Sequence, residues 1–141
     1  MTLVAGTGGC SPTSTKLAAG TYTVTATYTT SANFLTSTSA SSTLVVDQAG
    51  TTLTASPIVI PASGRHTITF SATLTSLVTG AGVAGQHILF TLGAQSCTAT
   101  TATTGLAHCT MSVVSSAPGS YSVSYAATVD YLSSGATGSV T

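Results

Sequence analysis

Charged side chains are almost absent from this sequence. Two basic and two acidic residues, Lys16, Arg65, Asp47 and Asp130, make up 3% of the 141 residues and leave a formal net charge of zero, whereas roughly 25% is typical of soluble domains. Binding to nucleic acid or to an anionic membrane surface requires clustered Lys and Arg. The sequence therefore predicts no nucleic-acid partner and no attachment to an anionic membrane.

Long apolar runs and an export signal are missing as well. No stretch of 18 apolar residues occurs, so the sequence predicts no membrane insertion. The segment from Met1 to Ala5 lacks the basic region and the long apolar region of a secretion signal, and we interpret it as the interior of a repeat preceded by a methionine. Asn33 is followed by Phe and Leu, so an Asn-x-Ser/Thr glycosylation acceptor is also missing.

Neutral hydroxyls take the place of the missing charges. The sequence contains 31 Thr and 21 Ser, and 43% of its residues are hydrophobic. Thr is β-branched and suits a pleated sheet surface, and it alternates with apolar residues over long stretches, which is the pattern of strands with one buried face. These features predict an all-β protein, with Ser/Thr/Gly-rich disorder as the alternative.

One strand-like motif occurs twice in the chain. Residues Gly20 to Ala26 read Gly-Thr-Tyr-Thr-Val-Thr-Ala, and residues Gly119 to Tyr125, 99 positions later, read Gly-Ser-Tyr-Ser-Val-Ser-Tyr. Behind them, Asn33-Phe-Leu35 lies 97 positions before Asp130-Tyr-Leu132. This period is the size of a sandwich domain and is longer than solenoid repeats. The sequence therefore predicts tandem domains of one kind.

The same spacing sets the expected domain boundaries. Cys10 also lies 99 positions before Cys109. We expect residues 1–47 to be the C-terminal half of one repeat and residues 48–141 to be a complete repeat. Half a sandwich would expose apolar faces and unpaired edges, so we expect residues upstream of this segment to complete it, with strands from another subunit as the alternative.

The alternation of Thr with apolar residues gives an expected strand order. In the first repeat we expect strands at residues 21–29 and 41–46. Seven or so short strands at the spacing of the second repeat predict a Greek-key β-sandwich. Those strands are expected at residues 51–55 and 58–60, then 67–75, 86–92, 96–101, 106–113, 120–127 and 136–141.

Two cysteines have the parity of inward-facing residues. Residues 96–101 and 106–113 are expected to form a hairpin, and Cys97 and Cys109 lie on its two arms. A disulfide across these adjacent strands would contribute on the order of 3 kcal/mol and would indicate an oxidising, extracellular compartment. Buried free thiols are the alternative. Cys10 takes the place of Cys109 in the first repeat, so its partner is expected upstream.

Several motifs resemble the bacterial Ig-like domain repeats of large secreted surface proteins. They are Gly20 to Tyr28 with Asn33-Phe-Leu35, Phe90 to Gly93, Ser96 to Thr98 and Gly105 to Thr110. The resemblance covers nearly the whole chain and implies tandem immunoglobulin-like Greek-key β-sandwiches. It also implies a structural module of an extracellular filament, stalk or adhesin on the cell surface. A glycan- or receptor-binding adhesin domain and a phage virion decoration module are the alternatives.

Candidate residues for catalysis or metal binding are sparse. His66, His87 and His108 are well separated in sequence, although the first two begin neighbouring predicted strands, and metal binding would require them to converge. Asp47 and Asp130 fall in different repeats, whereas a glycosidase needs two carboxylates about 5–10 Å apart. The sequence therefore predicts no enzyme, with no catalytic, cofactor-binding or metal site.

A covalent cross-link is the remaining chemical alternative for the first repeat. Some surface Ig-like domains carry an isopeptide bond between Lys and Asn beside a carboxylate, and Lys16, Asn33 and Asp47 share this repeat. The second repeat contains no lysine. The expectation is therefore that the chain has no isopeptide bond.

The expected partners follow from the neutral surface. Stacked modules without charge repulsion are expected to associate with each other or with neighbouring repeats of the same polypeptide. Surface glycans or a host receptor are the partners expected if the loops bind ligands. The loops at residues 80–85 and 94–95 are the candidates for that role, although they offer no aromatic platform.

Overall fold

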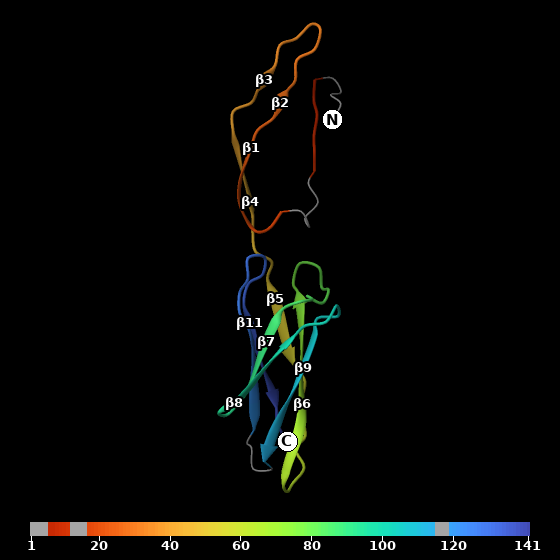
Figure 1. Ribbon diagram of the computed structural model, residues 1–141, viewed down its shortest axis with the longest axis vertical. Coiled ribbons are helices and arrows are strands. Elements are labelled where there is room, and N and C mark those ends of the chain that lie inside the picture. The colour runs from red at the N-terminus through yellow and green to blue at the C-terminus, as the bar shows by residue number, and fades with distance from the viewer. Residues whose placement is uncertain (1–5, 12–16, 115–118) are drawn as a thin grey trace. The chain divides into compact units, whose positions relative to one another are not determined.

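The computed structural model describes residues 6–11, 17–114 and 119–141 (Figure 1). The chain divides into two compact units, Met1–Gln48 and Ala49–Thr141. Within the described residues the regular structure is entirely β-strand, so the prediction of an all-β protein is confirmed. No helix that is long and apolar enough to cross a membrane occurs in this part of the chain.

The first unit is built from paired strands of one long hairpin. Strand β1 (Gly20–Val24) pairs antiparallel with β4 (Ser42–Val46), and the short strand β2 (Thr27–Tyr28) pairs antiparallel with β3 (Ser37–Thr38). These are two separate two-stranded sheets. Two-stranded hairpins are marginally stable by themselves in water, so the described strands of this unit have little of the support that a multistranded sheet provides.

The second unit contains a three-stranded antiparallel sheet. Its order is β5 (Thr51–Ala55), β6 (Arg65–Ser76) and β9 (Leu106–Val114). Alternate residues along β6 are buried from Phe70 onward, as the Thr/apolar alternation predicts. The Thr residues between them lie on the opposite face of this sheet.

A four-stranded antiparallel sheet completes the second unit. Its order is β11 (Ser134–Ser139), β10 (Ser120–Tyr125), β7 (His87–Leu92) and β8 (Gln95–Thr100). β10 therefore lies inside the sheet, between β11 and β7. Every second residue of β10 is buried and the others are exposed, so this strand has one core face and one outer face.

The predicted hairpin of residues 96–101 and 106–113 is wrong. β8 pairs with β7 and β9 pairs with β6, so the two strands belong to different sheets. A turn in which the Gly105 N–H donates to the Ala102 carbonyl (2.9 Å) carries the chain between the sheets. The physical reason is that both strands have an apolar face, and strands in opposed sheets bury these faces against each other.

The predicted first strand is split between the two sheets. β5 pairs with β6, whereas the segment around Ile58 forms a parallel bridge beside the end of β11. The Ile58 N–H donates to the Ser139 carbonyl (3.0 Å), and the Ile60 N–H donates to the Thr141 carbonyl (2.8 Å). Pro57 lies between the two parts and lacks an N–H, so the ladder with β6 stops there.

One hydrophobic core joins the two sheets of the second unit. Its side chains come from β5, β6 and β9 on one side and from β7 and β10 on the other, which is the arrangement of a β-sandwich. The largest fully buried side chains come from both sheets. They are Tyr121, Phe70, Phe90, Leu74 and Ile88.

Candidate functional site

Cys97 and Cys109 form a disulfide, as predicted, but they do not lie on adjacent strands. Cys97 is on β8 and Cys109 is on β9, so the bond joins the two sheets of the second unit. Their Cα atoms are 6.4 Å apart, within the range that disulfides span. The bond links β8, an edge strand of the four-stranded sheet, to β9 of the three-stranded sheet. Cys10, in the first unit, is exposed and free.

Tyr121 is the central polar contact between the sheets. This β10 side chain is 1% exposed, and its ring meets Phe70 of β6 edge to face, with 4.9 Å between centroids. Its hydroxyl donates to the Ser56 carbonyl and lies 3.2 Å from the Ser71 carbonyl. Burial raises the pKa of Tyr121 above its ordinary value, because desolvation disfavours the phenolate.

Gly138 makes room for the Tyr121 ring. The two residues are direct partners in the β10–β11 ladder. A Cβ atom on Gly138 would overlap Cε1 and Cζ of Tyr121, so the ring occupies the space that a side chain would need. In the sequence this position is marked only by a glycine inside an alternating strand, a sign of close approach by another group.

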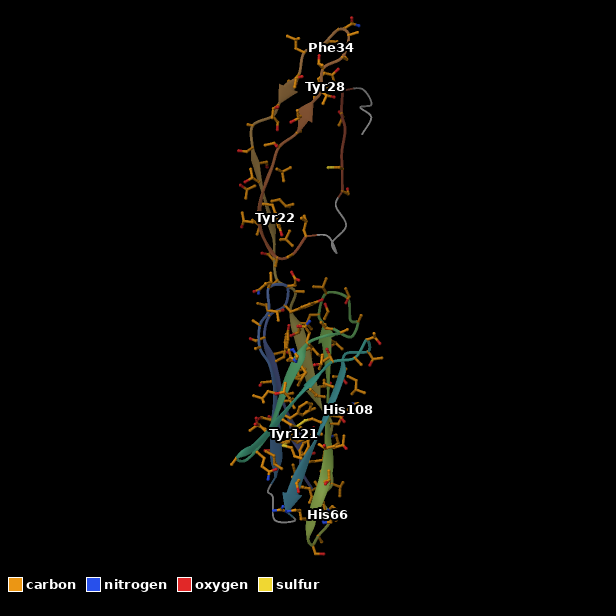
Figure 2. All side chains as sticks on the ribbon, viewed as in Figure 1. Tyr22, Tyr28, Phe34, His66, His108 and Tyr121 are labelled. Carbon is orange, nitrogen blue, oxygen red and sulfur yellow. A yellow bond between two sulfur atoms is a disulfide. The ribbon has the colours of Figure 1, made fainter. Side chains whose placement is uncertain are left out.

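The histidines do not converge. His66 on β6 lies opposite Val113 in β9, and His108 lies five residues away from Val113 along β9, about 17 Å at the usual strand rise. Figure 2 shows the two side chains well separated along this sheet. His87 is on β7 in the other sheet, so the strands that begin near His66 and His87 are consecutive in sequence but are not paired neighbours.

The remaining candidate residues gather no site. Among the described residues, no group of three or more His, Cys, Asp and Glu side chains is placed to hold a metal ion. Asp47 and Asp130 belong to different compact units. Lys16, the residue considered for an isopeptide bond, lies outside the described residues. That the chain lacks catalysis and cofactors stays a prediction.

The glycine-rich loop at residues 80–85 is packed onto the second unit. Val83 is buried, and its N–H donates to the Leu74 carbonyl (3.0 Å). A Cβ atom on Gly82 would overlap the backbone of Thr104, so glycine permits the loop to contact the β8–β9 turn. The centre of this candidate binding loop therefore has a structural role. Close backbone contact explains Gly82, whereas Gly80 and Gly85 have positive φ angles, which favour glycine.

Exposed apolar residues lie on two loops that both contact the segment just before β5. Leu77 and Val78, after β6, are 68% and 76% exposed, and Val129 and Leu132, between β10 and β11, are 66% and 47% exposed. The Leu77 N–H donates to the Gly50 carbonyl, and the Leu132 N–H donates to the Ala49 carbonyl, both at 2.9 Å. We call these four residues the apolar pole. Sequence reasoning missed it because loop residues have no periodicity.

Hydroxyl groups cover most of the outer surface of both sheets. Thr69 lies opposite Thr110 on the three-stranded sheet, and Ser122 lies opposite Thr137 on the four-stranded sheet. All four are exposed, and a few other side chains, such as Leu89, interrupt the pattern. We call these surfaces the hydroxyl faces. On the three-stranded sheet the exposed residues of this face include Thr54, Thr67, Thr69, Thr110 and Ser112. On the four-stranded sheet they include Thr98, Ser122, Ser124, Thr137 and Ser139.

The hydroxyl faces are neutral and can form hydrogen bonds. Hydroxyls donate and accept hydrogen bonds without the repulsion that charged rows cause between like surfaces. The second unit carries only Arg65 and Asp130 as charged residues.

No protein-family model matches this chain, and no curated protein matches it either.

Proposed function

We propose that this chain is a structural module of an extracellular filament, stalk or adhesin built from tandem Ig-like β-sandwich repeats. The observation that carries the proposal is the pair of hydroxyl faces, which offer neighbouring modules a neutral, hydrogen-bonding surface on both sides of the sandwich. The disulfide between Cys97 and Cys109 supports an oxidising compartment. A disulfide also suits a protein that is exposed at the cell surface.

The strand order supports an Ig-like arrangement of the second unit. In seven-stranded Ig-like sandwiches the first, second, fourth and fifth strands share one sheet, and the third, sixth and seventh share the other. β5, β6 and β9 correspond to the first, second and fifth strands, and β7, β10 and β11 to the third, sixth and seventh. The fourth strand, β8, differs by pairing with β7, where variable-type domains add strands beside the third strand. The repeated motif at Gly20 and Gly119 supports a tandem array.

The pairing of the segment at Ile58 with the end of β11 supports a mechanical role. Because the two segments run parallel, opposite pulls on the two ends of the unit would load their hydrogen bonds in shear. The bonds from the N–H groups of Ile58, Ile60 and Thr141 would then have to break together. A module that carries tension benefits from such a clamp between its first and last segments.

Salt dependence tests the proposal. Association of neutral faces should change less than about threefold between roughly 0.05 and 0.5 M salt, because no charges are screened. Light scattering of the full chain over this range measures it. The substitutions Thr69→Lys and Thr110→Lys should weaken association and make it salt-dependent. Thr103→Lys, in the β8–β9 turn, is the matched control. A steep salt dependence of the unmodified chain would contradict the proposal.

A second candidate is a receptor-binding adhesin domain, which the apolar pole favours. All four side chains are exposed, and their two loops both bond the segment just before β5. Ig-like domains carry binding loops at the ends of the sandwich. Aliphatic side chains suit an apolar protein surface better than a sugar. Replacement of Leu77 and Val129 by Ser should abolish binding to a host-protein array if this candidate is right, and should leave self-association unchanged.

A further inference from the structure

The β1–β4 hairpin has an apolar face that is open to solvent. Tyr22 lies directly opposite Leu44, and Val24 lies on the same face two residues along β1. Val24 is 46% exposed and Leu44 is 37% exposed. In the described part of the first unit, this sheet contains two strands only, and the other edge of β1 pairs with no strand.

The second unit shows how the repeated motif is buried when its sheet is complete. Tyr121 and Val123, 99 positions after Tyr22 and Val24, are 1% and 2% exposed. The opposite sheet and strand β7 cover this motif. The opposite sheet places Phe70 against Tyr121, and β7 pairs with the edge of β10 that β11 leaves free. The open face and edge of β1 are the surfaces that these two elements cover in the second unit.

Cys10 extends the same correspondence between the two units to a second residue type. It lies 99 positions before Cys109, and Cys109 is bonded to Cys97 on β8, the strand that follows β7. Cys10 is exposed and forms no disulfide. The first unit therefore has both an open apolar face and a free thiol where the second unit has contacts to the strands of residues 51–100.

We propose that the first unit binds a polypeptide segment of the kind that residues 51–100 form in the second unit. One strand of this partner pairs antiparallel with β1, as β7 pairs with β10, and a facing strand covers Tyr22 and Val24. Its cysteine, at the position of Cys97, forms a disulfide with Cys10. The two thiols lose two electrons and two protons to a small-molecule disulfide such as oxidised glutathione, which is reduced to two thiols.

The partner is identified by its pattern rather than by its charge. Strand addition gives affinity through main-chain hydrogen bonds and specificity through alternate side chains. The incoming strands need an apolar residue at every second position to pack against Tyr22, Val24 and Leu44. Ile88 and Phe90 give β7 this pattern. The inference rests on the proposed tandem-repeat architecture, since the correspondence between the units comes from the repeat.

The test mixes the full chain with a separate polypeptide of residues 49–100 in a glutathione redox buffer. Non-reducing mass spectrometry should find a disulfide between Cys10 and the added Cys97. Hydrogen exchange at the β1 amides should slow at least about tenfold, because a new strand protects them. Two controls accompany it: the full chain with Cys10→Ser, and the added polypeptide with Ile88→Thr and Phe90→Thr, which keeps its cysteine and loses the apolar pattern.

Three results would overturn the inference. They are equal disulfide yield with the Ile88→Thr and Phe90→Thr polypeptide, a Cys10–Cys10 dimer that protects β1 by itself, and no protection of β1. Because the added polypeptide can aggregate, a fusion that places residues 49–100 before Met1 repeats the measurement within one chain. Failure in both formats rejects the inference, whereas salt-dependent association of the unmodified chain rejects the proposed function, so the two failures are distinct.

Discussion

Replacing Gly138 with Ala should destabilise the second unit through a clash with one side chain. The new Cβ would overlap Cε1 and Cζ of Tyr121, which is 1% exposed and packed against Phe70. Any movement of the ring away from the new Cβ would disturb its contact with Phe70 and the bond from its hydroxyl to the Ser56 carbonyl. Either the ring moves and this bond lengthens, or the β10–β11 ladder separates locally.

The size of the effect follows from similar changes in packed cores. Inserting atoms into a filled core costs typically 1–3 kcal/mol. For a domain of roughly 100 residues, each kcal/mol lowers the melting temperature by about 4–8 °C. The Gly138→Ala protein should therefore melt about 5–20 °C below the unmodified chain in a thermal scan followed by circular dichroism.

Gly135 is the matched control on the same strand. It is exposed, and a Cβ there would lie 3.4 Å from the Val123 carbonyl oxygen, close to ordinary contact. Gly135→Ala should change the free energy of unfolding by less than about 0.5 kcal/mol. Tyr121→Leu should remove most of the additional cost of Gly138→Ala, because neighbouring sites are not additive. Equal effects of the two alanines, or additivity with Tyr121→Leu, would refute the steric explanation.

Three further predictions concern the contacts between the sheets. Tyr121→Phe should cost about 1–2 kcal/mol in urea unfolding, because it leaves the Ser56 carbonyl without its donor. Since burial raises the pKa of Tyr121, the folded state keeps the phenol proton where the unfolded state has lost it. The free energy of unfolding should therefore fall as the pH rises above about 10, and fall less for Tyr121→Phe; equal slopes would contradict this. Replacing Cys97 and Cys109 by Ser should cost about 3 kcal/mol, and a reductant should destabilise the unmodified chain equally but not this variant.

Strand positions could be predicted from the sequence, whereas strand partners could not. The Thr/apolar alternation predicted a strand at residues 67–75, and β6 extends over Arg65–Ser76. Alternation specifies which residues face inward, but it does not specify the neighbouring strand. A short turn such as the one at Gly105 suits a hairpin and a crossing between sheets equally well. The predicted hairpin therefore failed although both of its strands exist.

The same limit explains which contacts of the candidate site were foreseen. The Cys97–Cys109 bond was predictable because both residues face inward, and inward residues meet in either arrangement. The hydrogen bond of Tyr121 was not predictable, because its acceptors at Ser56 and Ser71 are backbone carbonyls. Every residue has such a carbonyl, so the sequence carries no mark of the partner. The apolar pole was missed for a similar reason, since its four residues come from unrelated loops.

The two copies of the repeated motif show how far a local pattern determines its role. Tyr22 and Tyr121 occupy the same place in the motif, yet the Tyr22 hydroxyl donates to the carbonyl of Ala18, four residues earlier, at 2.7 Å. The Tyr121 hydroxyl donates across the core to the opposite sheet. The motif therefore specifies a strand with one apolar face, and the facing sheet decides whether that face becomes core. Because a two-stranded hairpin alone is marginally stable, the proposed segment that covers Tyr22 would stabilise the described strands of the first unit, whereas the second unit already covers Tyr121 with its own opposite sheet.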